Sequence, residues 1–221
     1  MARSPSWCGV ILAAGESTRM GRDKALLPWP PASTGLSSPE QTFLSAAIRA
    51  LSPFADMVIV VAGKNESLLA PFVYVTAAVL VTNPDPDRGQ FSSLQVGLRE
   101  VLNRGRDAAI ITLVDRPPVS AGIIENLREA FENAPIEKWS VIPAYGGKHG
   151  HPIFIGREMI EVFLRAPATA TARDLEHENR EHIEYVPVND PLVVINVNTP
   201  EDYQALLSLP TPLDHQGSSK A

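Results

Sequence analysis

The chain has 221 residues, of which 44% are hydrophobic and 20% are charged, a composition typical of one soluble globular domain and not of a disordered or fibrous polymer. Lysine and arginine number 19 against 25 aspartates and glutamates, so the formal net charge is -6 at pH 7. This balance excludes a globally basic surface for nucleic acid, and no apolar run approaches the ~18 residues that span a membrane. We expect neither kind of partner, so any anionic ligand must be held by a local site.

The only cysteine, Cys8, lies in an apolar run that predicts a buried first strand. A single cysteine cannot form an internal disulfide, and a buried thiol behaves as a small hydrophobic group. The apolar stretch near the N-terminus is short and leads into the cations Arg19, Arg22 and Lys24, unlike a secretory signal. We therefore expect a cytoplasmic protein with Cys8 in its core.

Short apolar runs alternate with helical patterns through the first half of the chain, as in βαβ units with a mostly parallel sheet. Strands are predicted at residues 7–13, 57–62, 78–81, 109–114, 183–188 and 193–197, and around a Gly146-Gly147 turn within residues 141–155. The predicted fold class is α/β: one Rossmann-like domain, residues 1–209, with a mixed, mostly parallel sheet flanked by helices. Residues 210–221 lack an apolar face and are predicted to form a disordered tail.

Several helix starts carry recognisable capping residues. Ser38 precedes Pro39 and a helical pattern of apolar residues, which predicts a helix with Ser38 as its N-cap. Ser120 and Thr199 are the predicted N-caps of two later helices, and residues 88–103 show the pattern of an amphipathic helix. These helices are expected to flank the sheet.

The loop after the first predicted strand combines small residues with cations. Ligands of open α/β sheets bind at the carboxyl ends of strands, and here Gly15 and its small neighbours let backbone amides approach a phosphate chain. Arg19, Arg22 and Lys24 supply the cationic donors that a polyphosphate needs. The loop is therefore predicted to hold a triphosphate, and a solvated surface loop is the alternative.

The spacing of this loop excludes two common phosphate motifs. Five residues lie between Gly15 and Gly21, and Lys24 comes three residues later, whereas a P-loop has four residues between its glycines and lysine directly after the second. The Gly-x-Gly-x-x-Gly fingerprint of dinucleotide-binding domains is absent, which argues against hydride transfer.

Two further segments offer ligand contacts. Asp115 ends the strongest apolar run, so a rigid strand delivers its carboxylate to the phosphate loop, where it can hold Mg2+; capping of the following turn is the alternative. Ser92 and Ser93 open the helix of residues 88–103, at the positive helix end. Helix capping is the alternative role for these two serines, and it does not exclude contact with a nucleotide.

Residues 12–24 resemble the Leu-Ala-Ala-Gly-x-Ser-x-Arg-Met-Gly-x-x-Lys signature of the MobA-like NTP transferase family, which includes molybdenum cofactor cytidylyltransferases. The other matching segments, in order, are residues 89–98, 115–119, 150–152, 171–174 and 198–203. The resemblance implies a nucleotidyltransferase in which an acceptor phosphate attacks the α-phosphorus of a nucleoside triphosphate and releases pyrophosphate. The acceptor is expected to be a phosphorylated small molecule, with molybdopterin as one candidate.

The resemblance also implies a role for particular residues. The nucleotide is expected to contact Leu12, Ala13, Ala14, Gly15, Ser17, Arg19, Lys24, Ser92 and Ser93. Arg19, Lys24 and Asp115 are the expected catalytic residues, and Asp115 with Asn196 is expected to hold Mg2+. His151 and Asn198 are expected to contact the substrate, and Arg116, where relatives often have glutamine or methionine, is expected to be variable and substrate-facing.

Two features bear on the choice of nucleotide. Ala14 stands where guanylyl-transferring relatives tend to carry a second glycine, which favours CTP over GTP. Asn196 and Asn198, predicted to share a strand face, stand where cytidylyl-transferring relatives often have aspartate, and an amide oxygen binds Mg2+ more weakly. The alternatives are a guanylyltransferase that uses GTP, a nucleotide-binding maturation or chaperone protein with weak catalysis, and a glycosyltransferase.

The histidines give weaker signals. His149 and His151 have a spacing that places both rings on one face of a strand, so a zinc pair is an alternative, although no cysteine or acid stands at ligand spacing. His177 and His182 lie among charged residues and are predicted to belong to a solvated helix face.

Overall fold

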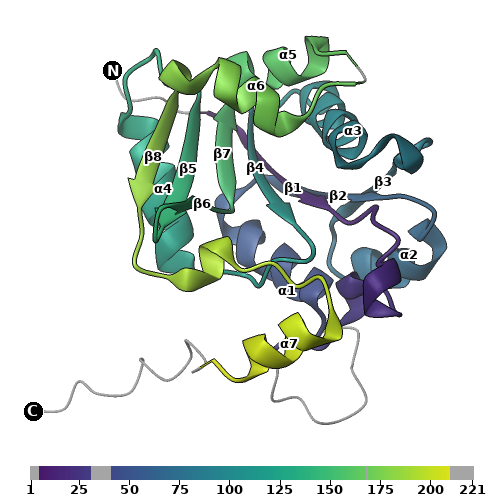
Figure 1. The fold of residues 1–221 in the computed structure, drawn as a ribbon. Coiled ribbons are helices and arrows are strands. Elements are labelled where there is room, and N and C mark those ends of the chain that lie inside the picture. Colours follow the sequence, from purple (N-terminus) through teal and green to yellow (C-terminus); the bar gives the residue numbers. More distant parts are fainter. Residues whose placement is uncertain (1–4, 31–40, 168, 210–221) are drawn as a thin grey trace, which may run out of the picture.

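The computed structural model describes residues 5–30, 41–167 and 169–209, which form one mixed sheet of eight strands with helices packed against it (Figure 1). The strands are β1 (Trp7–Leu12), β2 (Met57–Ala62), β3 (Val79–Thr82), β4 (Ala108–Leu113), β5 (Ser140–Tyr145), β6 (Lys148–His149), β7 (Ile153–Gly156) and β8 (Ile183–Pro187). The helices are α1 (Phe43–Leu51), α2 (Glu66–Tyr74), α3 (Gln90–Asn103), α4 (Ala121–Asn133), α5 (Arg157–Arg165), α6 (Ala172–Glu178) and α7 (Pro200–Leu207). The predicted α/β class is confirmed.

The sheet changes direction at its centre. Its order is β3-β2-β1-β4-β7-β5-β6, with β8 paired to β5. β1 lies parallel to both β2 and β4, whereas β7 runs antiparallel to β4 and β5. The chain therefore proceeds outward from β1 to β3 and then returns to β4 on the other side of β1. Ligands of open α/β sheets bind beyond the carboxyl ends of the strands at such a switch point.

Two apolar cores hold the helices against the two faces of the sheet. One core takes the buried side chains of α1, α2, α4 and α7, and the other takes those of α3, α5 and α6. Cys8 is fully buried in the second core, and burial raises the pKa of its thiol to about 12. The prediction that Cys8 is a core residue is confirmed.

Two local predictions differ from the structure. The predicted cap Ser38 lies outside the described residues, and α1 begins only at Phe43, because Thr42 and Ser45 form a reciprocal capping box there. The predicted strand at residues 193–197 is wrong. Pro191 and the side chain of Asp190, which accepts a hydrogen bond from the Leu192 amide, start a 3-10 turn, Pro191–Val194, instead.

Gly97 lets α3 approach the sheet closely. A Cβ atom at this position would lie 2.8 Å from Val10 Cγ1 and 3.0 Å from Val61 Cγ2. Gly97→Ala should therefore lower the free energy of unfolding by about 1–3 kcal/mol, because both neighbours belong to the packed sheet. Urea denaturation measures this change. Gly122→Ala in α4 is the control, because its Cβ atom would meet nothing within 4 Å; equal stability of the two variants would contradict the packing argument.

Candidate functional site

A cleft of about 500 Å³ lies at the carboxyl edge of the sheet, between the loops that follow β1 and β4. Its lining residues are Leu12, Ala14, Gly15, Glu16, Ser17, Thr18, Arg19, Lys24, Pro86, Asp87, Gly89, Gln90, Ser93, Leu113, Val114, Asp115, Asn196 and Asn198. We call it the first cleft. Its position agrees with the switch point of the sheet.

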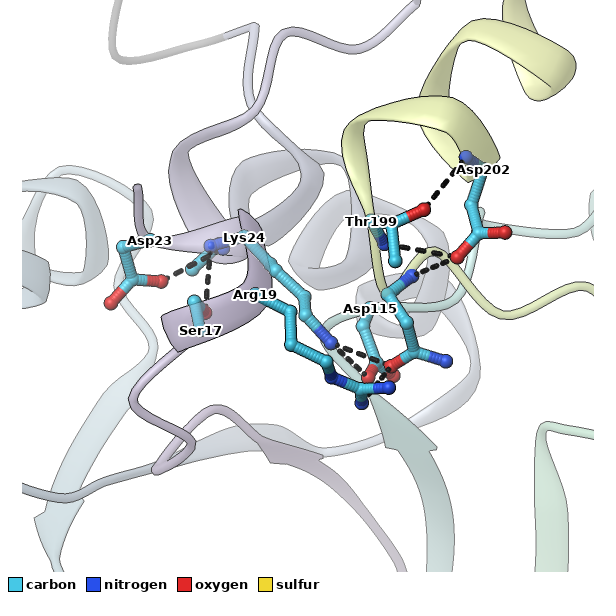
Figure 2. Close-up of polar contacts among 9 residues, drawn as sticks. Ser17, Arg19, Asp23, Lys24, Asp115, Thr199 and Asp202 are labelled. Carbon is cyan, nitrogen blue, oxygen red and sulfur yellow. Dashed lines mark hydrogen bonds and ion pairs between the residues drawn. The ribbon is translucent and has the colours of Figure 1, made fainter. Parts of the chain in front are cut away.

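A cluster of polar side chains forms one wall of the first cleft (Figure 2). Lys24 Nζ lies 3.0 Å from Asp115 Oδ2 and 2.9 Å from Asn198 Oδ1. Arg19 Nη2 donates to the same Asn198 oxygen at 3.3 Å. The side chains of Lys24 and Asp115 are only 11% and 21% exposed, so water screens their attraction less than that of a surface pair.

The backbone of the loop after β1 directs Lys24 toward Asp115. Ser17 adopts the left-handed conformation at φ 53°, and its hydroxyl accepts a hydrogen bond from the Lys24 amide at 3.1 Å. The Asp23 carboxylate accepts one from the Ala25 amide at 2.9 Å and so caps the short turn Lys24–Leu26. These two hydrogen bonds from backbone amides to side-chain oxygens fix the backbone around Lys24. They therefore hold the lysine in place in a loop whose described residues contain no α-helix or strand.

The start of α7 positions Asn198. The Asp202 carboxylate accepts hydrogen bonds from the amides of Asn198 and Thr199, and the Thr199 hydroxyl accepts one from the Asp202 amide (Figure 2). The two backbone hydrogen bonds hold the pKa of Asp202 below its usual value. The Val197 amide donates to the Asp115 carbonyl at 2.8 Å. The segment before α7 is thereby fixed beside the end of β4.

One oxygen of Asp115 is left for a ligand. Asp115 Oδ1 is buried and has no hydrogen-bond partner among the described residues, while Oδ2 is paired with Lys24. An unpaired buried carboxylate oxygen is costly, and hard cations such as Mg2+ prefer oxygen ligands. Asn196 supplies an amide in the same cleft, so the donor set fits a divalent cation whose remaining ligands are phosphate and water. Among the described residues, those of this cleft included, no group of three or more histidine, cysteine or acidic side chains could hold a metal ion on its own.

Two of the residues predicted to touch the nucleotide do not line the first cleft. Ala13 is buried, and its amide donates to the Val61 carbonyl. Ser92 is buried as well, and its hydroxyl donates to the Gly89 carbonyl at 2.8 Å. The other residues predicted for the nucleotide and the metal all line the cleft. Arg22, the third cation of the loop, lies outside it.

Asn65 supports the phosphate loop, and the sequence analysis missed it. Its side-chain nitrogen donates to the Ala13 carbonyl at 2.9 Å and to Asp23 Oδ2 at 2.6 Å, and its oxygen accepts from the Gly63 amide. Asn65 thus ties the loop after β1 to the loop after β2. The signal was present in the sequence, because residues 63–65 follow an apolar strand at the same edge of the sheet.

Asn65→Ala should raise the KM for the nucleotide about fivefold to tenfold and leave kcat closer to the wild-type value. The variant loses three hydrogen bonds that order the loop but no group in the cleft. Steady-state kinetics with varied nucleotide measures the change. Asn133→Ala, which removes one exposed hydrogen bond on α4, is the control, and a KM shift of equal size in both variants would contradict the assignment.

A second cleft of about 600 Å³ adjoins the first and shares Leu12, Gly89, Gln90 and Leu113 with it. His151 and Arg116 line this second cleft, and Arg116 Nη1 donates to the Val193 carbonyl. Burial, followed by the nearby Arg116 guanidinium, holds the pKa of His151 well below its usual range. Neutral His151 therefore offers an uncharged ring. His151 and Arg116 lie apart from the Lys24 cluster, in the cleft next to it.

The remaining histidine predictions are corrected in part. His149 is the last residue of β6, and His151 follows that strand, so the two do not share one strand face; the His149 ring stacks on Tyr185. His177 is exposed on α6, as expected. His182 is not simply solvated, because its ring stacks on Trp139 with centroids 3.4 Å apart.

In the described part of the chain, no helix has the length and apolar character required to cross a membrane.

Comparison with known proteins agrees with the geometry. The MobA-like NTP transferase domain model matches residues 9–183. The molybdenum cofactor cytidylyltransferase of Escherichia coli K12 is 22% identical over 195 residues, covering 88% of this chain and 92% of that protein. The probable molybdenum cofactor guanylyltransferase of Mycolicibacterium paratuberculosis is 28% identical over 208 residues, covering 93% and 98%.

Solved structures show the same fold. The crystal structure of Rv0371c from Mycobacterium tuberculosis H37Rv superposes with a TM-score of 0.76 at 24% identity, covering 94% of this chain and 100% of that one. A manganese complex of Rv0371c superposes with a TM-score of 0.70 at 22% identity, covering 92% and 100%. Since the family match spans most of the chain, this protein belongs to the MobA-like NTP transferase family of nucleotidyltransferases.

Proposed function

We propose that this nucleotidyltransferase moves a nucleoside monophosphate, CMP from CTP in preference, onto a phosphorylated small-molecule acceptor such as molybdopterin. An oxygen of the acceptor phosphate attacks the α-phosphorus of the triphosphate. The bond between the α-phosphorus and the bridging oxygen breaks, and pyrophosphate leaves. This chemistry asks the protein chiefly for in-line positioning and for neutralisation of charge.

The observation that carries the proposal is the contact of Lys24 with Asp115 and Asn198 on the wall of the first cleft. Lys24 and Arg19 would bind the β- and γ-phosphates, and their charge would stabilise the departing pyrophosphate. The small loop residues Ala14 and Gly15 leave room for the phosphates beside the backbone. No covalent nucleophile is required.

Asp115 and Asn196 would hold Mg2+, which would neutralise part of the charge of the nucleotide phosphates. The unpaired Oδ1 atom of Asp115 supports this assignment. Lys24 has a second role, because its ion pair holds the Asp115 carboxylate in its orientation before the ligands bind.

The preference for CTP rests on Ala14, a half-buried residue that lines the first cleft. The relatives described above carry both cytidylyl- and guanylyltransferase names, so a GTP-dependent enzyme is the second candidate. The asparagines at positions 196 and 198 favour a third candidate, a nucleotide-binding protein with weak catalysis, because amide oxygens bind Mg2+ less tightly than carboxylates.

Pyrophosphate release in the presence of molybdopterin and Mg2+ separates these candidates when CTP, GTP, ATP and UTP are compared. We expect release only when the acceptor is present, and fastest with CTP. Fastest release with GTP would show a guanylyltransferase. Nucleotide binding without any release would show the weakly catalytic protein, and tighter binding of a nucleotide sugar than of any triphosphate would show a glycosyltransferase.

A further inference from the structure

The second cleft contains a carboxylate that the reaction at the first cleft does not use. Glu176 lies on α6 and lines the second cleft. Among the described residues, none forms a hydrogen bond or an ion pair with its carboxylate. A partly buried carboxylate without a donor is costly, and a ligand that brings N–H groups to it would remove that cost.

The surroundings of Glu176 are suited to a flat ring. The cleft floor is apolar and includes Phe91 and Phe163, whose rings meet edge to face with centroids 6.0 Å apart. His149 lines the cleft, and its ring is held by stacking on Tyr185 at 4.0 Å. Apolar and aromatic walls with few polar groups are typical of pockets for small organic molecules, in which the polar groups fix the orientation.

From this geometry we propose that Glu176 is a specificity-determining residue for the acceptor: its carboxylate accepts hydrogen bonds from the N–H edge of a flat nitrogen heterocycle bound in the second cleft. This inference rests on the proposed function, because it takes the second cleft as the acceptor site. Arg116 follows Asp115 directly and also lines the second cleft, so an anionic group on the same acceptor would find a cation near the first cleft.

Burial raises the pKa of Glu176 to about 7. The titratable and charged groups of the second cleft are Arg88, Arg116, His149, His151, Arg173 and Glu176. Tyr185, whose ring stacks on His149, also interacts with the charges of Glu176 and Arg180. Because the ionised form accepts the hydrogen bonds, acceptor binding through Glu176 should strengthen as the pH rises from 6 to 8. Glu176→Gln removes this contribution.

The test compares the wild-type protein with Glu176→Gln and Glu178→Gln. Glu178 is exposed on the same helix and does not line either cleft, so its variant is the matched control. Equilibrium ultrafiltration measures molybdopterin binding, and steady-state kinetics gives the KM values for molybdopterin and nucleotide at pH 6, 7 and 8. We expect Glu176→Gln to weaken molybdopterin binding and raise its KM at least about tenfold at pH 8, with the nucleotide KM unchanged. The difference between variant and wild type should shrink at pH 6.

Equal molybdopterin binding by Glu176→Gln and the wild type, equal losses in both variants, or no binding by the wild type would overturn the inference. Glu176→Asp keeps the charge and should restore part of the pH dependence, which a merely structural role would not require. If the wild type binds molybdopterin through Glu176 but transfers no nucleotide to it, the proposed function fails while the assignment of Glu176 stands.

Discussion

Replacement of Lys24 by alanine should slow nucleotidyl transfer at least about tenfold. A charge-assisted contact with a phosphate contributes roughly 1.5–3 kcal/mol, and each ~1.4 kcal/mol corresponds to one factor of ten in rate. The variant also leaves Asp115 Oδ2 without its 3.0 Å ion-pair partner. The loss should therefore appear in kcat as well as in the KM for the nucleotide, as measured by pyrophosphate release.

Lys148→Ala is the control for this experiment, since Lys148 is an exposed lysine on β6 that lines neither cleft. Its turnover should equal that of the wild type. A Lys24→Ala variant with near-normal turnover would remove Lys24 from the catalytic site and leave the arrangement in Figure 2 as a structural cluster.

Asp115→Asn should lower kcat about a hundredfold or more. The substitution removes the negative charge that would hold the cation, and metal charge stabilisation in such sites is worth several kcal/mol. It also replaces the ion pair with Lys24 by a weaker hydrogen bond, which the amide oxygen can still accept. The concentration of Mg2+ that gives half-maximal activity should rise, and a magnesium titration of pyrophosphate release measures it.

Asp56→Asn gives the matching control. Asp56 pairs with Arg106 at the surface and directly precedes β2, at the amino edge of the sheet, so it is remote from the first cleft. If Asp115→Asn kept both the wild-type rate and its magnesium dependence, the carboxylate would have only the turn-capping role that the sequence also allows. A urea denaturation curve for each variant separates a lowered kcat from a loss of folded protein.

The sequence predicted the first cleft well because its main residues follow apolar strands. The cations of the loop after β1 and the carboxylate of Asp115 after β4 directly follow buried strands. Because ligands of open α/β sheets bind beyond the carboxyl ends of the strands, predicting the two strands was sufficient to bring these side chains together. Asn196 and Asn198 also reach the cleft, although the predicted strand around them is a 3-10 turn followed by extended backbone. The placement was right despite the wrong element, because Val197 is anchored to the Asp115 carbonyl.

Other features depend on contacts whose partners cannot be chosen from the sequence alone. Asn65 acts through hydrogen bonds to Ala13 and Asp23, each more than forty positions away in the chain. Glu176 stands in a charged helix and looks solvated in the sequence, yet the packing of α6 places it in a cleft. Thr42 replaces the predicted cap of α1 because Ser45 completes a capping box there, whereas the sequence offered Ser38 and Pro39 as an equally regular start.

The position of a radiolabel tests the central claim most directly. The protein is incubated with Mg2+, molybdopterin and CTP that carries the label on either the α- or the γ-phosphorus, and the acceptor is then separated from the nucleotide. A nucleotidyltransferase should transfer the α-label to the acceptor and release the γ-label as pyrophosphate. Transfer of the γ-label to the acceptor, or binding of CTP with no label transferred to the acceptor, would contradict the account.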